Sequence, residues 1–290
     1  MAGTIHFGDN LPILQAMEDE SVHLIYIDPP FNTGKTQSLN RMKTVQSENG
    51  NRKGFKGKRY DSESLGEQQY QDIFDDYLGF LELRLIEARR LLKPSGTIYV
   101  HLDYREVHYC RVMMDGVFGR KNFLNEIIWA YDYGGRPKDR WPAKHDNILV
   151  YAKSAGKHIF NSDDVERIPY MAPGLVTPEK AKRGKLPTDT WWHTIVPTAG
   201  KERTGYPTQK PLGIMRRIVS ASTNPGDLVL DFFAGSGTTG EVCIELGRPF
   251  ILMDSNREAI GVMAKRFDGR PNIDWIGVSG AESSGDSGSN

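Results

Sequence analysis

The segment LVLDFFAGSGTTG at residues 228–240 decides how this chain folds. Its first residues form a short apolar run, which is typical of a strand buried in a sheet. The run leads into 235–240, which has the glycine spacing G-x-G-x-x-G, and a helical pattern follows over 238–246. Asp254 ends the next expected strand, roughly twenty residues further on. This arrangement predicts an adenosine-bearing cofactor, because glycines let a ligand approach the backbone and the acid can bind ribose hydroxyls. Glycines that serve only tight packing are the alternative.

The alternation of strand and helix patterns continues on both sides of this segment. Strands are expected at 4–7, 22–27, 97–102, 123–131, 147–152, 227–233 and 250–253, and helices at 68–92, 106–118, 212–221, 238–246 and 257–267. Such alternation predicts an α/β fold with a doubly wound, mostly parallel sheet and right-handed crossovers. Ligands of these sheets bind at the carboxyl ends of strands.

A second segment whose residues could take part in a reaction, Asp-Pro-Pro-Phe at 28–31, follows the expected strand 22–27. The prolines stiffen the turn and remove competing N–H donors. The Asp28 carboxylate and the Pro29 carbonyl can accept hydrogen bonds from an exocyclic amino group, which favours a pyramidal nitrogen whose lone pair faces an electrophile. The Phe31 ring can stack on the base. Asp-Pro-Pro is also a common strand-ending turn, so this segment is informative mainly together with the glycine turn.

Two features favour S-adenosylmethionine over a nicotinamide dinucleotide as the cofactor. Asp231 stands just before the glycine turn, where its carboxylate could hold the methionine ammonium and would repel a pyrophosphate. The sequence also ends soon after Asp254, which leaves little room for the second half of a dinucleotide fold. A nicotinamide-dependent oxidoreductase with the same turn geometry is an alternative.

Composition narrows the class of protein further. The 290 residues carry 37 basic and 37 acidic side chains, so global charge predicts no partner and a nucleic-acid surface must be a local cluster. The two cysteines, Cys110 and Cys243, lie outside any zinc-binding spacing, so we expect reduced thiols and no metal. We expect neither a signal peptide nor a membrane span, since no apolar run approaches about 20 residues.

The order of the two segments resembles that of the β class of amino-group DNA methyltransferases, which place D-P-P-[FYW] before the cofactor motif F-x-G-x-G. The resemblance covers most of 4–277 and is strongest at 8–11, 24–34, 145–153, 207–211 and 231–239. It implies the S-adenosylmethionine-dependent methyltransferase fold in permuted motif order. It also implies methyl transfer to N6 of an adenine flipped out of duplex DNA. Cytosine-N4 enzymes of this family more often begin the motif with Ser, so N4 methylation is the first alternative.

The resemblance assigns roles to the matching residues. The catalytic pocket would comprise Asp28, Pro29, Pro30 and Phe31. Together with Asp231, the cofactor site would comprise Asp9, Asn10, Leu11, Asp28, Thr208, Gln209, Lys210, Phe233, Ala234, Gly235, Ser236, Gly237, Thr238 and Asp254. Asp254 would hold the ribose and Lys210 would lie near the cofactor carboxylate, with a solvated lysine as the alternative. Neither cysteine follows a proline, so cytosine-C5 methylation is not expected.

Basic residues mark the expected DNA contacts. Residues 32–60 are polar and basic and predict a mobile loop, and residues 132–206 are the candidate target-recognition region. The expected phosphate contacts are Lys35, Arg41, Lys43, Arg52, Lys53, Lys56, Lys58, Arg136, Lys138, Arg140 and Lys144. The aromatic cluster Trp141, Trp191, Trp192 and His193 could serve either packing or base contact. Residues 1–278 are expected to form one domain, and the Ser/Gly-rich 279–290 a disordered tail.

These inferences predict a cytoplasmic enzyme of a prokaryote or phage that acts on double-stranded DNA. A homodimer and a restriction endonuclease partner are expected only by analogy with the family. Two further alternatives stay open: methylation of RNA or of a protein glutamine amide, and a catalytically silent DNA-binding protein.

Overall fold

The computed structural model describes residues 2–31, 35–46, 52–53, 59–72, 76–197 and 200–278. The chain divides into two compact units, one formed by Met1–Pro29 with Leu78–Asn290 and the other by Pro30–Tyr77. Each unit is described by itself, and the expected single domain over 1–278 stays a prediction. The expected disordered tail, 279–290, lies outside the described residues.

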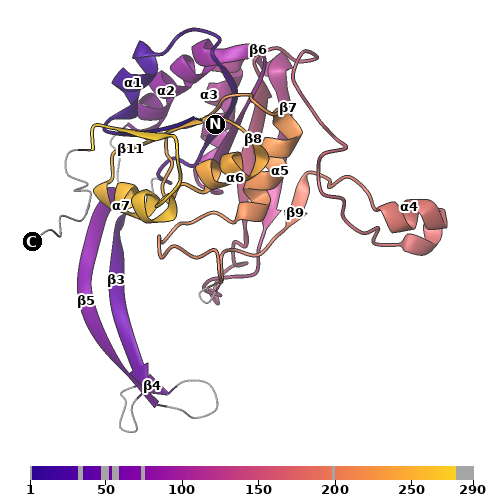
Figure 1. Ribbon diagram of the computed structural model, residues 1–290. Coiled ribbons are helices and arrows are strands. Elements are labelled where there is room, and N and C mark those ends of the chain that lie inside the picture. Colours follow the sequence, from indigo (N-terminus) through magenta and orange to yellow (C-terminus); the bar gives the residue numbers. More distant parts are fainter. Residues whose placement is uncertain are drawn as a thin grey trace, which may run out of the picture. The chain divides into compact units, whose positions relative to one another are not determined.

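The first unit is built on a nine-stranded sheet (Figure 1). In spatial order its strands are β12 (Ile273–Ile276), β1 (Gly3–Phe7), β11 (Phe250–Asp254), β10 (Val229–Asp231), β2 (Val22–Ile27), β6 (Leu92–Leu102), β8 (His145–Ala152), β7 (Phe123–Ala130) and β9 (Thr190–Trp192). Neighbouring strands run parallel except where β8 pairs with β6 and β7. The α/β fold with a mostly parallel sheet is confirmed.

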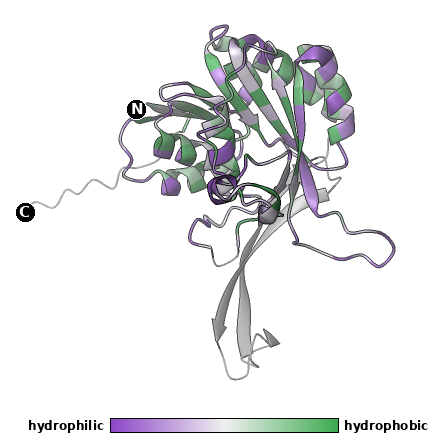
Figure 2. Cartoon of the chain, turned by 90° about the vertical axis from the view of Figure 1, so that its right-hand side faces the viewer, coloured by the Kyte–Doolittle hydropathy of each residue, from purple (hydrophilic) through white to green (hydrophobic). Residues whose placement is uncertain are grey.

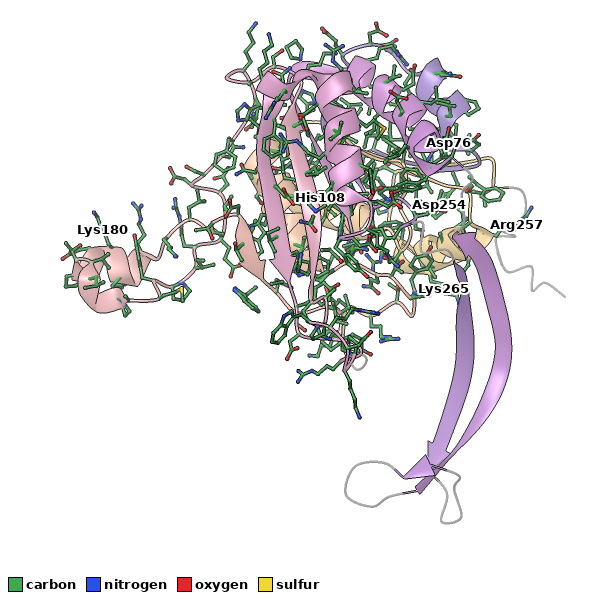
Figure 3. The ribbon with its side chains drawn as sticks, turned by 180° about the vertical axis from the view of Figure 1, so that it is seen from behind. Asp76, His108, Lys180, Asp254, Arg257 and Lys265 are labelled. Carbon is green, nitrogen blue, oxygen red and sulfur yellow. The ribbon has the colours of Figure 1, made fainter. Side chains whose placement is uncertain are left out.

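Helices cover both faces of this sheet, as expected of a doubly wound fold. The α-helices are α1 (Asn10–Ala16), α2 (Tyr77–Leu91), α3 (Val107–Met114), α4 (Pro178–Arg183), α5 (Leu212–Ser222), α6 (Thr238–Leu246) and α7 (Arg257–Arg266). Figures 1 and 3 show α1 to α3 on one face and α5 to α7 on the other. A π-helical turn at Asp115–Gly119 follows α3, and short 3-10 turns lie at Arg120–Asn122 and Pro173–Leu175. None of the described helices is long and apolar enough to cross a membrane.

The central strand β2 is apolar from Leu24 to Ile27 because both of its faces are covered. From Leu24 to Ile27, the β2 side chains are at most 2% exposed. Leu24 and Tyr26 join the core cluster that includes Ile214 and Ile218 of α5. Hydrophobic residues accordingly gather on the strands and on the sheet-facing sides of the helices (Figure 2). A strand buried on both faces explains the continuous apolar run that the sequence shows at this position.

The helix expected at 68–92 is shorter in the structure. It begins at Tyr77, and its buried positions Leu81, Leu85 and Ala88 have the expected helical spacing. Residues 68–72 belong instead to strand β5 (Arg59–Asp72). Their polar composition provides no apolar helical face, so cross-strand pairing supplies their backbone hydrogen bonds instead.

Over the described part of 32–60 the structure has strands where a loop was expected, and the expected mobility stays a prediction. Strand β3 (Lys35–Gln46) pairs antiparallel with β5, from Lys35 opposite Asp72 to Gln46 opposite Tyr60, and β4 (Arg52–Lys53) extends the pairing. A polar sequence can form such a ribbon because the ladder bonds join backbone groups, whatever the side chains. The predicted DNA contacts Lys35, Arg41 and Lys43 lie on β3 and Arg52 and Lys53 on β4, whereas Lys56 and Lys58 lie outside the described residues.

The irregular sequence of residues 155–206 predicts an insertion on the scaffold, but one part of it belongs to the sheet. Strand β9 extends the sheet beyond β7, with Trp191 opposite Trp129. Helix α4 lies on an arm away from the sheet, where Figure 3 labels Lys180. Strand β12 and helix α1 were not anticipated either. Both are short: β12 forms by pairing with β1, and α1 begins at a cap by Asp9, so the composition of neither segment indicates it.

Candidate functional site

The two segments that carry the chemistry leave adjacent strands of the sheet. Strands β2 and β10 are parallel neighbours, with Leu24 opposite Val229 and Ile25 opposite Leu230. Asp28 follows β2 and Asp231 ends β10, so both emerge at the carboxyl edge of the sheet. The two segments are therefore neighbours at one edge of the sheet.

The turn after β10 requires its glycines. Gly235 and Gly237 have φ of +51° and +74°, values that residues with a Cβ rarely adopt. A Cβ on Gly237 would lie 2.8 Å from Met263 Cγ, and one on Gly235 would lie 3.2 Å from Tyr206 Cε1. The turn therefore presents bare backbone next to Tyr206.

Asp254 closes this turn from the end of β11. The Gly235 amide donates a hydrogen bond of 2.8 Å to Asp254 Oδ2, and the Asn256 amide donates one of 2.8 Å to Oδ1. Burial raises the pKa of Asp254, although these amide bonds oppose the shift. The ends of β10 and β11 thus meet at one carboxylate beside the glycine turn.

Asp231 faces into the protein. It is 2% exposed, the Thr239 hydroxyl donates to its Oδ2 at 2.5 Å, and the Phe233 amide donates to its Oδ1 at 3.1 Å. Burial raises the pKa of Asp231 to about 7, and the charges of Asp28 and Asp254 act in the same direction. Each carboxylate oxygen accepts a hydrogen bond from within the turn, and the expected contact of Asp231 with the methionine ammonium stays a prediction.

The N-terminus of α1 is tied to the same edge of the sheet. Asn10 Nδ2 donates to the Phe232 carbonyl at 2.6 Å, and Asn10 Oδ1 accepts from Arg84 Nε at 2.6 Å. Asp9 caps the Leu11 amide at 3.1 Å and forms an ion pair of 2.8 Å with Arg84. The expected residues Asp9, Asn10 and Leu11 therefore lie together, and Arg84, which the sequence did not single out, joins them.

The 202–211 loop brings Lys210 to Asp28. Lys210 Nζ forms an ion pair with Asp28 Oδ2, and both side chains are mostly buried. Thr238 at the start of α6 donates to the Lys210 carbonyl at 3.1 Å. Gln209 is held by its own loop, accepting from Thr204 and donating to the Glu202 carbonyl, while Thr208 is exposed. Lys210 thus connects the turn at Asp28 and Pro29, the Asp28 corner, with the glycine turn.

A buried polar cluster lies behind Asp28. His101, at the end of β6, is 0% exposed; its Nδ1 lies 3.0 Å from the Tyr26 hydroxyl and 3.7 Å from Asp28 Oδ1. Its Nε2 lies 3.2 Å from Asp146 Oδ2, and the Tyr131 hydroxyl donates to Asp146 Oδ1 at 3.0 Å. Sequence analysis placed His101 and Asp146 in or beside expected strands without assigning them a role, because neither residue belongs to a local motif.

The electrostatics of this cluster favour a charged Asp146 and neutral phenols. Burial alone would raise the pKa of Asp146, but its hydrogen bond and charge interaction with His101, followed by the charge of Lys210, bring it below its usual value. Burial raises the pKa of Tyr26 well above its usual value, and the charge of Asp28 adds to this effect. Burial raises the pKa of Tyr131 as well.

The predicted DNA contacts of the first unit lie between β7 and β8. Arg136 pairs with Asp132, Arg140 pairs with Asp139, and Lys144 Nζ donates to the carbonyls of 133–135. Lys138, the remaining predicted contact, is exposed.

The aromatic cluster divides between the core and the surface. Trp191 is 7% exposed and packs in the core, whereas Trp141 and Trp192 are 95% and 79% exposed. His193 Nδ1 lies 2.8 Å from the Thr194 carbonyl. Packing therefore explains Trp191, and the other two tryptophans are available to a partner.

Other features of the described residues lie apart from this edge. A cavity of about 530 Å³ is lined by residues that include Tyr99, Trp191 and Arg217, but neither Asp28 nor Gly235 is among them. Within the described ranges, no group of three or more His, Cys, Asp or Glu side chains could hold a metal ion. Cys110 and Cys243 are buried, and burial raises the pKa of both thiols.

Comparison with known proteins agrees with this arrangement. The model of the DNA methylase family (N6/N4 Mtase) matches residues 22–265. The DNA adenine methyltransferase YhdJ of Escherichia coli (strain K12) is 33% identical over 92% of this chain and 83% of its own length. The type II methyltransferase M.HpaI of Haemophilus parainfluenzae is 32% identical over 88% of this chain and 71% of its own.

Solved structures share the fold. The M1.HpyAVI-SAM complex has a TM-score of 0.57 at 23% identity, covering 92% of this chain and 100% of that one. The cytosine-N4-specific PvuII DNA methyltransferase has a TM-score of 0.60 at 17% identity, covering 93% and 88%. With the family model matching most of its length and both segments at one sheet edge, the chain belongs to the DNA methylase family.

Proposed function

We propose that this chain is a site-specific DNA methyltransferase that transfers a methyl group from S-adenosylmethionine to N6 of an adenine flipped out of duplex DNA. The observation that carries the proposal is the parallel pairing of β2 with β10. Because of it, a donor bound at the glycine turn and an acceptor bound at Asp28 would be neighbours. The adenine relative named above supports N6 as the target atom.

The Asp28 corner is suited to an amino group. The Asp28 carboxylate is 16% exposed and the Pro29 carbonyl follows it in a stiff turn. Two acceptors on the amino hydrogens would favour a pyramidal nitrogen, and holding the base in place removes much of the entropic barrier. Pro30 and Phe31 complete the proposed pocket, with Phe31 stacking on the base.

The residues of the glycine turn fit S-adenosylmethionine, which would supply an electrophilic methyl group. Gly235 leaves bare backbone beside Tyr206 that a Cβ would cover, and Asp254 offers carboxylate oxygens at the end of the next strand. We assign Asp254 to the ribose, and Phe233 and the glycines to the methionine part. Lys210 would serve the cofactor carboxylate. Asp9, Asn10, Leu11, Thr208, Gln209, Ala234, Ser236 and Thr238 would complete the site. Asp231 accepts hydrogen bonds from Phe233 and Thr239 that hold the turn in shape, and its carboxylate would also hold the methionine ammonium.

Double-stranded DNA is the proposed partner. The phosphate contacts would come from Arg136, Lys138, Arg140 and Lys144 and from the basic residues of 35–58. Binding should weaken steeply as salt rises, since it depends on counterion release. Type II methyltransferases among the relatives support a place in a restriction-modification system. We therefore also propose a partner endonuclease, a homodimer, and a cytoplasmic location in a prokaryote or phage host.

The test is to incubate the purified chain with duplex DNA and methyl-labelled S-adenosylmethionine, and then to identify the labelled nucleoside by mass spectrometry. The proposal predicts N6-methyldeoxyadenosine. Recovery of N4-methyldeoxycytidine alone would overturn the base assignment. Label that enters RNA or protein but not DNA would overturn the substrate class, and reduction of a substrate by NADH would favour the oxidoreductase alternative.

A further inference from the structure

We propose that His101 is a positioning residue that takes the proton from Asp28 after each methyl transfer, with Asp146 holding its ring. This inference rests on the proposed function, because it concerns the proton that the amino group must lose. It adds a residue from β6 and one from β8 to a site that the sequence motifs place only at β2 and β10.

The first observation is an unsatisfied oxygen. Asp28 Oδ1 is buried and has no hydrogen-bond partner in the described structure, whereas Oδ2 pairs with Lys210. A buried acceptor without a partner costs about 1–3 kcal/mol, so its presence indicates a strain reservoir or a catalytic use. The side chain that faces it is His101, with Nδ1 at 3.7 Å from Oδ1.

The second observation is that the surroundings of His101 favour one tautomer. Because the pKa of Asp146 is lowered, this residue is a carboxylate near neutral pH, and it can only accept a hydrogen bond. The proton of a neutral His101 ring therefore lies on Nε2, which is 3.2 Å from Asp146 Oδ2. This leaves a lone pair on Nδ1, the nitrogen that faces Asp28.

The remaining neighbours allow the ring to change its charge. The Tyr26 hydroxyl, 3.0 Å from Nδ1, can donate to a lone pair or accept from an N–H, so it can contact both forms of the ring. Tyr131 fixes the second Asp146 oxygen. Lys210 is the cation of the cluster, and it pairs with Asp28 on the side opposite to His101.

Each methyl transfer leaves the amino group with one proton to lose. When the N–C bond forms and the C–S bond of the donor breaks, the amino nitrogen becomes positively charged and must release one proton. Asp28 accepts that proton and passes it from Oδ1 to Nδ1 of His101. The product is an imidazolium between the carboxylates of Asp28 and Asp146. It releases its proton to water when the products leave, so that Asp28 and His101 are both ready for the next base. The transfer requires Oδ1 and Nδ1 to approach by roughly 1 Å, to the distance of a charge-assisted hydrogen bond.

The test compares His101→Gln with wild type in single-turnover methylation of DNA across a pH series. A general base contributes about 10²–10⁴-fold, so the variant should be at least about 10²-fold slower at the alkaline end of the series. The ratio of the two rates should shrink as pH falls, because a general base accelerates a reaction only in its unprotonated form. The KM for S-adenosylmethionine should change by less than about twofold, since His101 is not among the residues proposed for the cofactor site. The matched control is His108→Gln, an exposed histidine on α3 (Figure 3), which should behave as wild type.

Asp146→Asn is the second variant, because His101 is fully buried and its replacement could prevent folding. This change keeps the side-chain volume and removes the charge that stabilises the imidazolium, so it should also slow methylation most at high pH. Rates within about twofold of wild type, or a loss that is equal at every pH, would overturn the inference. Failure of the proposed function would be visible separately, as wild-type protein that puts no methyl on DNA.

Discussion

The glycine turn after β10 and the Asp28 corner after β2 differ in where their hydrogen-bond partners come from. Asp231 in the turn is bound by Phe233 and Thr239, two and eight residues away. Asp28 pairs with Lys210, 182 residues away, and faces His101. The carboxylate of Asp231 thus finds both of its partners within the turn. The corner is assembled from distant segments and keeps one buried carboxylate oxygen unsatisfied. This difference suggests that the glycine turn binds the cofactor and that the Asp28 corner takes part in methyl transfer.

Asp28→Ala should have the largest effect of these variants, and it should act on methyl transfer at the Asp28 corner. Methyl transfer should fall by at least about 10³-fold, because the variant removes an acceptor that acts on the reacting nitrogen. Binding of S-adenosylmethionine, measured by calorimetry, should stay within about threefold, since the glycine turn is untouched. Loss of cofactor binding with residual turnover would show that the roles of the two segments are reversed.

Gly235→Val should weaken cofactor binding at the glycine turn. The residue has φ of +51°, and its Cβ would lie 3.2 Å from Tyr206 Cε1. A left-handed conformation costs about 1–2 kcal/mol for a residue with a side chain, and the new side chain fills space proposed for the cofactor. Affinity for S-adenosylmethionine should fall by about 10²-fold or more. The control Gly261→Ala, on α7 with no atom near the added Cβ, should bind normally, and normal binding by Gly235→Val would contradict the assignment.

Lys210→Met should show whether Lys210 serves the cofactor as well as Asp28, because Lys210 contacts both regions. Removing its charge leaves Asp28 without its ion-pair partner and removes the proposed contact to the cofactor carboxylate. The KM for S-adenosylmethionine should rise by about tenfold, the equivalent of about 1.4 kcal/mol. Steady-state kinetics with Lys265→Met, an exposed lysine on α7 (Figure 3), provide the control. An unchanged KM would mean that Lys210 serves only Asp28.

Asp231→Asn should have the smallest effect and a characteristic pH dependence. The pKa of Asp231 is raised to about 7 in the folded chain, so the folded state binds its proton more tightly than the unfolded state does. The stability that it contributes is present below the unfolded pKa of about 3.9 and is lost as pH rises through about 7. The unfolding free energy of wild type relative to the variant should therefore decrease from about pH 4 to about pH 8. Urea titrations at each pH provide the measurement, and a difference that increases with pH would contradict the raised pKa.

The same contrast explains what the sequence could predict. The glycine turn, Asp254 and the Asp28 segment could be located because each is a short pattern tied to one strand end. Lys210 was anticipated only through a family resemblance. His101 and Asp146 could not be recognised as parts of the site, because they meet Asp28 only after β6 and β8 have paired. The ribbon of β3 and β5 was missed for a related reason, since its pairing involves backbone groups that composition does not reveal.

A crystal structure with S-adenosylhomocysteine and duplex DNA would test the central claim, that the two strand ends form one methyl-transfer site. The account predicts the cofactor sulfur over the turn at Gly235. It also predicts a flipped adenine whose amino nitrogen lies about 3 Å from the Asp28 carboxylate and the Pro29 carbonyl. A cofactor bound elsewhere, for example in the cavity beside Trp191, or a base held away from Asp28, would contradict it.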